Sequence, residues 1–163
     1  MAPGLEKCIG GGFDVRRGSL DDPHVLELLN GHQEVARLQS PPVGWTVPEI
    51  EALRHCGTRL WTAWSGAILA GTAALKGLGA GHGEVKALHT AETMRGQGVA
   101  TCLLEHIIAT ARLDGMTRLS LETGSSPYFT GARRLYARLG FTECEPFAPY
   151  HADPNSYFMT LVL

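Results

Sequence analysis

The sequence has no excess of positive charge, no closely spaced cysteine pair and no long apolar run. Lys and Arg total 14 against 16 for Asp and Glu, a net charge of -2, so the overall field attracts neither nucleic acid nor anionic lipid. The four cysteines show no zinc-ligand spacing, which predicts reduced thiols and no metal site. The longest nearly apolar run, Ala67 to Leu75, is shorter than the ~18 residues of a membrane helix. These absences predict a cytoplasmic protein with neither a nucleic-acid nor a membrane partner.

The length, 163 residues, suits one domain with a core of its own. Residues 1–12 are small, glycine-rich and unpatterned, which predicts a flexible leader or an expression remnant. Residues 13–163 are then a single domain. Glycine is over-represented, with 20 residues, so the positions of the glycines carry information.

Hydrophobic spacing predicts strands and helices in alternation. Period-two patterns mark strands at 13–17, 84–90 and 118–122, a hairpin of 60–65 with 68–75, and closing strands at 141–144 and 157–163. Spacing of three and four residues marks helices at 25–35, 50–53, 99–112 and 129–139. Between the hairpin and the next strand, a flexible connection is predicted by Gly77, Gly79, Gly81 and Gly83. This order predicts one α/β (α+β) domain with a mixed sheet.

The sharpest local feature is the loop Arg95-Gly96-Gln97-Gly98, between a predicted strand and a long predicted helix. The two glycines let the backbone approach a ligand, and the first amides of the helix have no partner within it. The helix dipole and Arg95 add positive charge, so the loop suits a phosphate group. Glycines before a helix also serve as plain turn residues, and the loop alone fits both interpretations. It lacks the Gly-Lys-Ser/Thr of a Walker A motif and the third glycine of GxGxxG.

The second half of the sequence holds two motifs, Arg95-x-x-Gly98-x-Ala100 at a predicted strand-to-helix junction and Ala132-Arg-Arg-Leu-Tyr136-Ala-Arg-Leu-Gly140-Phe141 in a later predicted helix. They resemble the Q/R-x-x-G-x-G/A signature and the A-x-x-L-Y-x-x-x-G-F helix of the GNAT superfamily of acyl-CoA-dependent N-acetyltransferases. With Leu121-Glu-Thr-Gly124, these stretches extend from Glu84 to about Cys144. The resemblance implies a mixed, mostly antiparallel central sheet flanked by helices, whose central strands splay apart to bind CoA.

The resemblance also implies which residues hold the co-substrate, acetyl-CoA. The family's loop amides bind the pyrophosphate, which implies Arg95, Gly96, Gln97, Gly98, Val99 and Ala100. The preceding strand binds the pantetheine arm through its backbone, which implies Leu88, His89 and Thr90. This sequence departs from the family at two points, a common proline replaced by Glu92 and an asparagine missing before the Tyr136 helix. The second departure leaves Thr130 as the candidate for a side-chain contact to pantetheine.

Acetyl transfer to an amine requires a base and an acid. An amine with a pKa near ~10 must lose a proton before attack, and the CoA thiolate must gain one as it leaves. Tyr136 matches the family's proton-donating tyrosine, with a packing role beside Leu135 as the alternative. Glu84 resembles the glutamate that many members use as a base, often through water, and Glu122 on the adjacent predicted strand competes for that role. A solvated carboxylate at a strand end is the alternative interpretation of Glu84.

The function implied by the resemblance is N-acetyl transfer from acetyl-CoA to a primary amine of a small molecule or amino-acid-like acceptor. The implied route is direct attack in a ternary complex. The alternatives are a non-catalytic acyl-CoA sensor and a phosphate-binding module for another nucleotide. The acceptor stays open, and both a monomer and a homodimer fit. The tail, residues 146–159, either borders the acceptor site or only leads the last strand to the sheet.

Overall fold

A computed structural model of the protein describes residues 6–7, 12–39, 49–55 and 57–163. One sheet of eight strands runs through it in the order β1-β2-β3-β4-β5-β6-β8-β7. All neighbouring strands are antiparallel except β5 and β6, which confirms the expected mixed, mostly antiparallel sheet. The strands are β1 (Glu6–Lys7), β2 (Asp14–Arg17), β3 (Thr58–Ser65), β4 (Ile68–Gly79), β5 (His82–Thr90), β6 (Arg118–Gly124), β7 (Thr142–Glu143) and β8 (Ser156–Val162).

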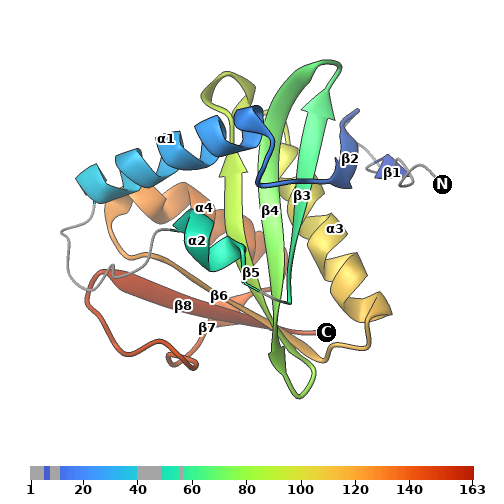
Figure 1. Cartoon of the computed structure of the whole chain (residues 1–163). Helices are drawn as coiled ribbons and strands as arrows, with labels where there is room; N and C mark the ends of the chain where they lie inside the picture. The colour runs from blue at the N-terminus through green and yellow to red at the C-terminus, as the bar shows by residue number, and fades with distance from the viewer. Residues whose placement is uncertain (1–5, 8–11, 40–48, 56) are drawn as a thin grey trace.

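Helices cover both faces of the sheet (Figure 1). The helices are α1 (Pro23–Gln39), α2 (Glu49–Leu53), α3 (Val99–Leu113) and α4 (Thr130–Arg138), with short 3-10 turns η1 (Glu92–Met94) and η2 (Pro127–Phe129). The α1 and α2 helices pack Val25, Leu29 and Leu53 against one face. The α3 and α4 helices pack against the other face, where the larger core cluster lies. Each aliphatic side chain buried there contributes roughly 1.5–3 kcal/mol.

The two central strands diverge, and we call this divergence the fork. Pairing between β5 and β6 covers His82–Glu84 and Arg118–Ser120 and stops there, while β5 continues to Thr90. A register shift in the β4–β5 ladder places an extra residue in β5, and Ala87 has a φ of 49°. The Thr72 hydroxyl donates to the Ala87 carbonyl at 2.8 Å. Because a bulge bends its strand and increases its twist, it turns the end of β5 away from β6.

The expected flexible connection at Gly77, Gly79, Gly81 and Gly83 is wrong. The first two glycines belong to β4, Gly83 belongs to β5, and Gly77 pairs with Gly83. The turn itself consists of Ala80 and Gly81, both at positive φ. Close packing explains the glycine at 83, since a Cβ there would lie 2.7 Å from the Met116 sulfur. These glycines therefore lie in a hairpin, where Gly83 serves close packing and Gly79 and Gly81 adopt positive φ at the turn.

The expectation of reduced thiols is wrong for Cys102, which is disulfide-bonded, while Cys144 is free. Spacing along the chain does not report which cysteines meet in space, and Cys8 and Cys56 lie outside the described residues. So does most of the expected leader, although its Glu6–Lys7 pairs with β2. Across the described residues, no helix has the length and apolarity to span a membrane.

Candidate active site

The loop between η1 and α3 exposes two glycines in the left-handed region of backbone space. Gly96 has a φ of 74° and Gly98 a φ of 86°, a conformation that costs other residues strain. A Cβ built at either position meets no atom within 4 Å. The space in front of the loop is therefore open to a ligand.

The α3 helix begins directly behind this loop without a capping side chain. Gly98 is its N-cap and makes no side-chain cap hydrogen bond. The first amides of a helix have no acceptor within it, and the dipole places partial positive charge there. Arg95 stands at the loop entrance, and the side-chain Nε2 of Gln97 donates to the Thr93 carbonyl at 3.3 Å. The open glycines, the uncapped amides and Arg95 together fit a pyrophosphate group.

Adding one methyl group to this loop tests its role in binding CoA. We expect Gly98→Ala to weaken CoA binding at least about tenfold, because its Cβ would occupy the space in which anion and amides meet. Stability should fall by only about 1–2 kcal/mol, the cost of a left-handed alanine. Gly115→Ala is the matched control, since Gly115 has a φ of 76°, open space around it, and lies beyond the far end of α3. Calorimetry and thermal melts measure both effects; equal affinity in the two variants would contradict the assignment.

The end of β5, where Leu88, His89 and Thr90 lie, is held from the α1 side. His32 of α1 contacts the Thr90 carbonyl through Nε2 at 2.9 Å. Its ring stacks on His89 with centroids 4.5 Å apart, and His89 in turn contacts both Glu49 carboxylate oxygens at 3.2 and 3.3 Å. This chain of contacts joins α1, β5 and α2. One carbonyl that the resemblance assigns to pantetheine is thus bound by His32.

The charge states along this chain follow from burial and neighbours. Burial, with the charge of His89, lowers the pKa of His32 to about 4, so its ring is neutral at pH 7. Burial acts to raise the pKa of Glu49, but the hydrogen bond and charge of His89 outweigh it and leave that pKa below its usual value. Glu49 is therefore a carboxylate.

His32 makes stability depend on pH in a defined window. The unfolded ring takes up a proton near pH 6.5 and the folded ring only near 4, so stability falls as pH falls between these values. We expect His32→Gln, whose amide can still donate to Thr90, to flatten the melting temperature against pH in that window. His24→Gln, which changes a side chain of the same helix that is 67% exposed, should leave the slope unchanged. Parallel curves for wild type and His32→Gln would contradict this account.

Ionisable side chains converge where the fork opens. Glu84, 2% exposed, is the last residue of β5 that pairs with β6. Its Oε1 accepts hydrogen bonds from the Tyr150 hydroxyl at 2.5 Å and the Lys86 ammonium at 3.3 Å. Lys86 also donates to the Tyr150 oxygen at 3.1 Å. The predicted base is thus a buried, clamped carboxylate, and the solvated interpretation of Glu84 is wrong.

Glu122 and Tyr136 lie on the β6 side of the fork. Burial raises the pKa of the Glu122 carboxyl, whose Oε1 accepts a hydrogen bond from Ser156 at 2.9 Å. Burial also raises the pKa of Tyr136, and the nearby charge of Glu122 raises it further. The Tyr136 phenol is therefore protonated at neutral pH, and its ring packs edge-on against Phe141. A proton donor and two carboxylates are available together.

The connection between β6 and α4 is braced by Arg133. Its guanidinium donates to the carbonyls of Gly124 and Ser126 and to the Thr130 hydroxyl. Thr130, the predicted pantetheine contact, is thus engaged within the loop. Among the described residues, the buried hydroxyl of Ser126 finds no hydrogen-bond partner. An unpaired buried hydroxyl beside the fork fits a site that receives a polar ligand group.

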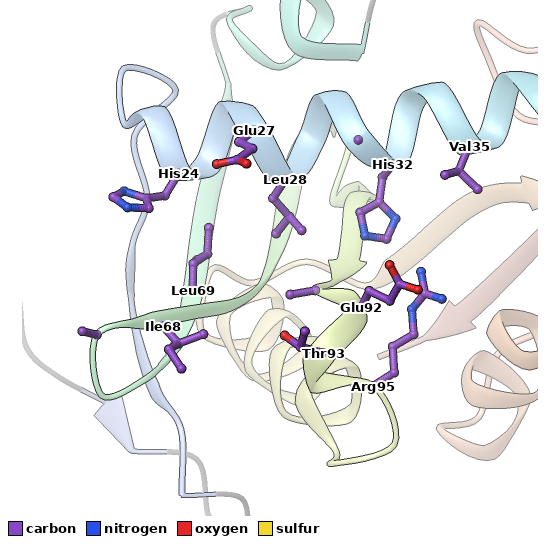
Figure 2. A pocket seen from close by; sticks show the side chains of 13 residues that line it. His24, Glu27, Leu28, His32, Val35, Ile68, Leu69, Glu92, Thr93 and Arg95 are labelled. Carbon is purple, nitrogen blue, oxygen red and sulfur yellow. The ribbon is translucent and has the colours of Figure 1, made fainter.

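A separate groove of about 740 Å³ runs along α1 (Figure 2). His24, Leu28 and Val35 point into it from the helix, and Ile68 and Leu69 face them from the start of β4. Further along the helix, His32 points down from α1, above Glu92 and Arg95. The groove thus borders the loop and the end of β5, outside the ionisable cluster at the fork.

Sequence reasoning missed Lys86, Glu49 and His32, and named Tyr150 only as part of the tail. Lys86 could have been found, because period-two spacing predicts that it shares a strand face with Glu84. Contacts of Glu49 with His89, and of His32 with Thr90, bridge 40 and 58 residues and leave no local signal.

Comparison of the sequence with known proteins assigns the chain to a family. The sequence profile of the Acetyltransferase (GNAT) family matches residues 30–141. The chain belongs to the GNAT family. It is 44% identical over 146 residues to the uncharacterized N-acetyltransferase YsnE of Bacillus subtilis (strain 168), covering 90% of this chain and 97% of YsnE. It is 40% identical over 151 residues to the uncharacterized N-acetyltransferase YedL of Escherichia coli (strain K12), covering 93% and 95%.

Solved structures share the GNAT fold. A Klebsiella pneumoniae protein assigned to the acyl-CoA N-acyltransferases superposes with a TM-score of 0.76 at 25% identity, covering 94% of this chain and 99% of that chain. A GNAT acetyltransferase from Elizabethkingia anophelis with acetyl-CoA bound has a TM-score of 0.68 at 21% identity, covering 93% and 99%. The predicted family and fold are confirmed, and the GNAT protein described here is an acetyl-CoA-dependent acyltransferase.

Proposed function

We propose that this enzyme moves an acetyl group from acetyl-CoA to a primary amine of a small molecule or amino-acid-like acceptor, by direct attack in a ternary complex. The observation that supports this most is the grouping of Glu84, Glu122 and Tyr136 at the fork. The charge of Glu84 acts on Glu122, and the charge of Glu122 acts on Tyr136. Two carboxylates and a protonated phenol are what amine deprotonation and thiolate protonation require.

The co-substrate is held by residues on both sides of the fork. Backbone amides of the loop and of the first turn of α3 (Arg95, Gly96, Gln97, Gly98, Val99 and Ala100) bind its pyrophosphate. The backbone of Leu88, His89 and Thr90 and the side chain of Thr130 line its pantetheine arm. The thioester then lies where β5 and β6 part.

Glu84 and Tyr136 divide the proton transfers. Glu84 takes a proton from the acceptor's ammonium, and the freed nitrogen attacks the thioester carbonyl. The carbon–sulfur bond breaks, and Tyr136 gives its proton to the departing thiolate. Burial raises the pKa of the Cys144 thiol, which keeps it protonated and disfavours a covalent relay through it.

Binding and turnover measured separately test this function. Thermal melts with acetyl-CoA, CoA, ATP and NAD identify the ligand, since a ligand at a hundred times its dissociation constant stabilises by about 2.7 kcal/mol. Thiol release with a panel of amines then measures turnover. We expect a shift with both CoA species and amine-dependent release. A CoA shift without turnover would support the sensor instead, and a shift with ATP or NAD alone would support another nucleotide.

A further inference from the structure

A segment near the C-terminus closes over the start of β5. After β7, the chain returns to β8 through residues 144–155. Phe147 lies 5.2 Å from Tyr150 and 5.8 Å from Phe158, measured between ring centroids, and 5.7 Å from the His82 ring. The Tyr150 amide donates to the Phe147 carbonyl at 2.8 Å, which makes a turn. These contacts fix the Tyr150 ring independently of its hydroxyl.

The Tyr150 hydroxyl reaches the buried carboxylate of Glu84, 66 residues away in sequence. It shares the Oε1 atom with Lys86, whose ammonium also lies 5.8 Å from the centre of the Tyr150 ring. Burial raises the pKa of Tyr150, and so do the charge of Glu84 and the hydrogen bond to it. The phenol therefore stays protonated and donates a hydrogen bond to Oε1 of Glu84.

The arrangement does more than satisfy a buried charge. Lys86 already pairs with Glu84, and an ammonium partner stabilises a buried carboxylate. The phenol adds a second donor on the same oxygen, which restricts rotation of the carboxylate. Two donors on Oε1 leave the lone pairs of Oε2 for an incoming group.

We infer that Tyr150 is a positioning residue, which with Lys86 fixes Glu84 so that Oε2 faces the acceptor amine. The inference rests on the proposed function. In the step it supports, Oε2 takes the proton of the acceptor's ammonium, the nitrogen bonds to the acetyl carbon, and the carbon–sulfur bond breaks. The sulfur receives the Tyr136 proton, the nitrogen loses its second proton through water as it becomes an amide, and that proton restores Tyr136. Glu84 then releases its own proton to water. No other reactant is needed.

Tyr150→Phe removes one hydroxyl and keeps the ring that packs on Phe147 and Phe158. We expect kcat to fall about tenfold or more, the effect of one hydrogen bond to a charged group, while the KM for acetyl-CoA is unchanged. The ionisable groups that face this pair are Lys86, His82, Glu122 and Glu49, which are retained in the variant.

A double-mutant cycle separates positioning from a general structural role. If the hydroxyl acts through Glu84, Tyr150→Phe has no further effect on kcat in a Glu84→Gln background. Tyr157→Phe is the matched control, because its hydroxyl bonds the exposed Glu143 at the sheet edge. An unchanged kcat in Tyr150→Phe, or additive losses, would overturn the inference. Absence of turnover in the wild-type enzyme would instead overturn the proposed function.

Discussion

Replacing Tyr136 with phenylalanine should lower turnover about 100-fold or more, the usual contribution of a general acid. The phenol is buried and protonated, whereas a phenyl ring has no proton to give to the thiolate. The ring itself should still pack against Phe141, 5.9 Å away between centroids. Binding of acetyl-CoA and the melting temperature should therefore change little.

The measurement is thiol release at saturating acetyl-CoA, with affinity determined separately by calorimetry. Tyr157→Phe serves as a control, because it also removes one phenol hydroxyl, which bonds the exposed Glu143 of the edge strand β7. Equal turnover in wild type and Tyr136→Phe would remove the acid assignment. Loss of CoA binding would show instead that the phenol supports the pantetheine pocket.

Replacing Glu84 with glutamine should have a comparably large effect, at least about 100-fold on turnover. The amide oxygen can still accept from Tyr150 and Lys86, but the side chain cannot take a proton from the acceptor. The fold and the binding of CoA should persist, because the loop and α3 are separate from this carboxylate. Turnover should partly recover at high pH, because more of the acceptor amine is then already deprotonated.

Glu122→Gln is the comparison that identifies the base. Its side chain keeps the hydrogen bond from Ser156, and the raised pKa of Glu122 makes it the competing proton acceptor. We expect a much smaller loss than in Glu84→Gln under the same conditions. A larger loss in Glu122→Gln would identify Glu122, on β6, as the base.

The parts of the site that sequence could predict are local ones. Gly96 and Gly98 precede a helix whose buried residues recur at three and four positions, so the loop and α3 could be placed from pattern alone. Tyr136 came from a motif whose spacing a single helix preserves, and Glu84 came from its place at the start of the strand before the loop. Each of these signals depends on a few consecutive residues.

The rest depends on tertiary packing. Tyr150 reaches Glu84 only because aromatic contacts hold residues 144–155 against β5 and β8, and no spacing along the chain encodes that path. The glycines at 77–83 were misassigned because glycine usually interrupts strands, whereas here three of them pair within a hairpin and Met116 excludes a side chain at Gly83. The disulfide at Cys102 was missed because spacing along the chain does not show which cysteines meet in space.

Acetyl transfer at the fork from acetyl-CoA to an amine is tested by mass spectrometry of the reaction mixture, which quantifies acetylated amine against free CoA over time. We expect one acetylated amine for each CoA released, at a rate that depends on the amine and on Glu84 and Tyr136. CoA release that is independent of the amine, or that continues without acetylated product, would contradict it.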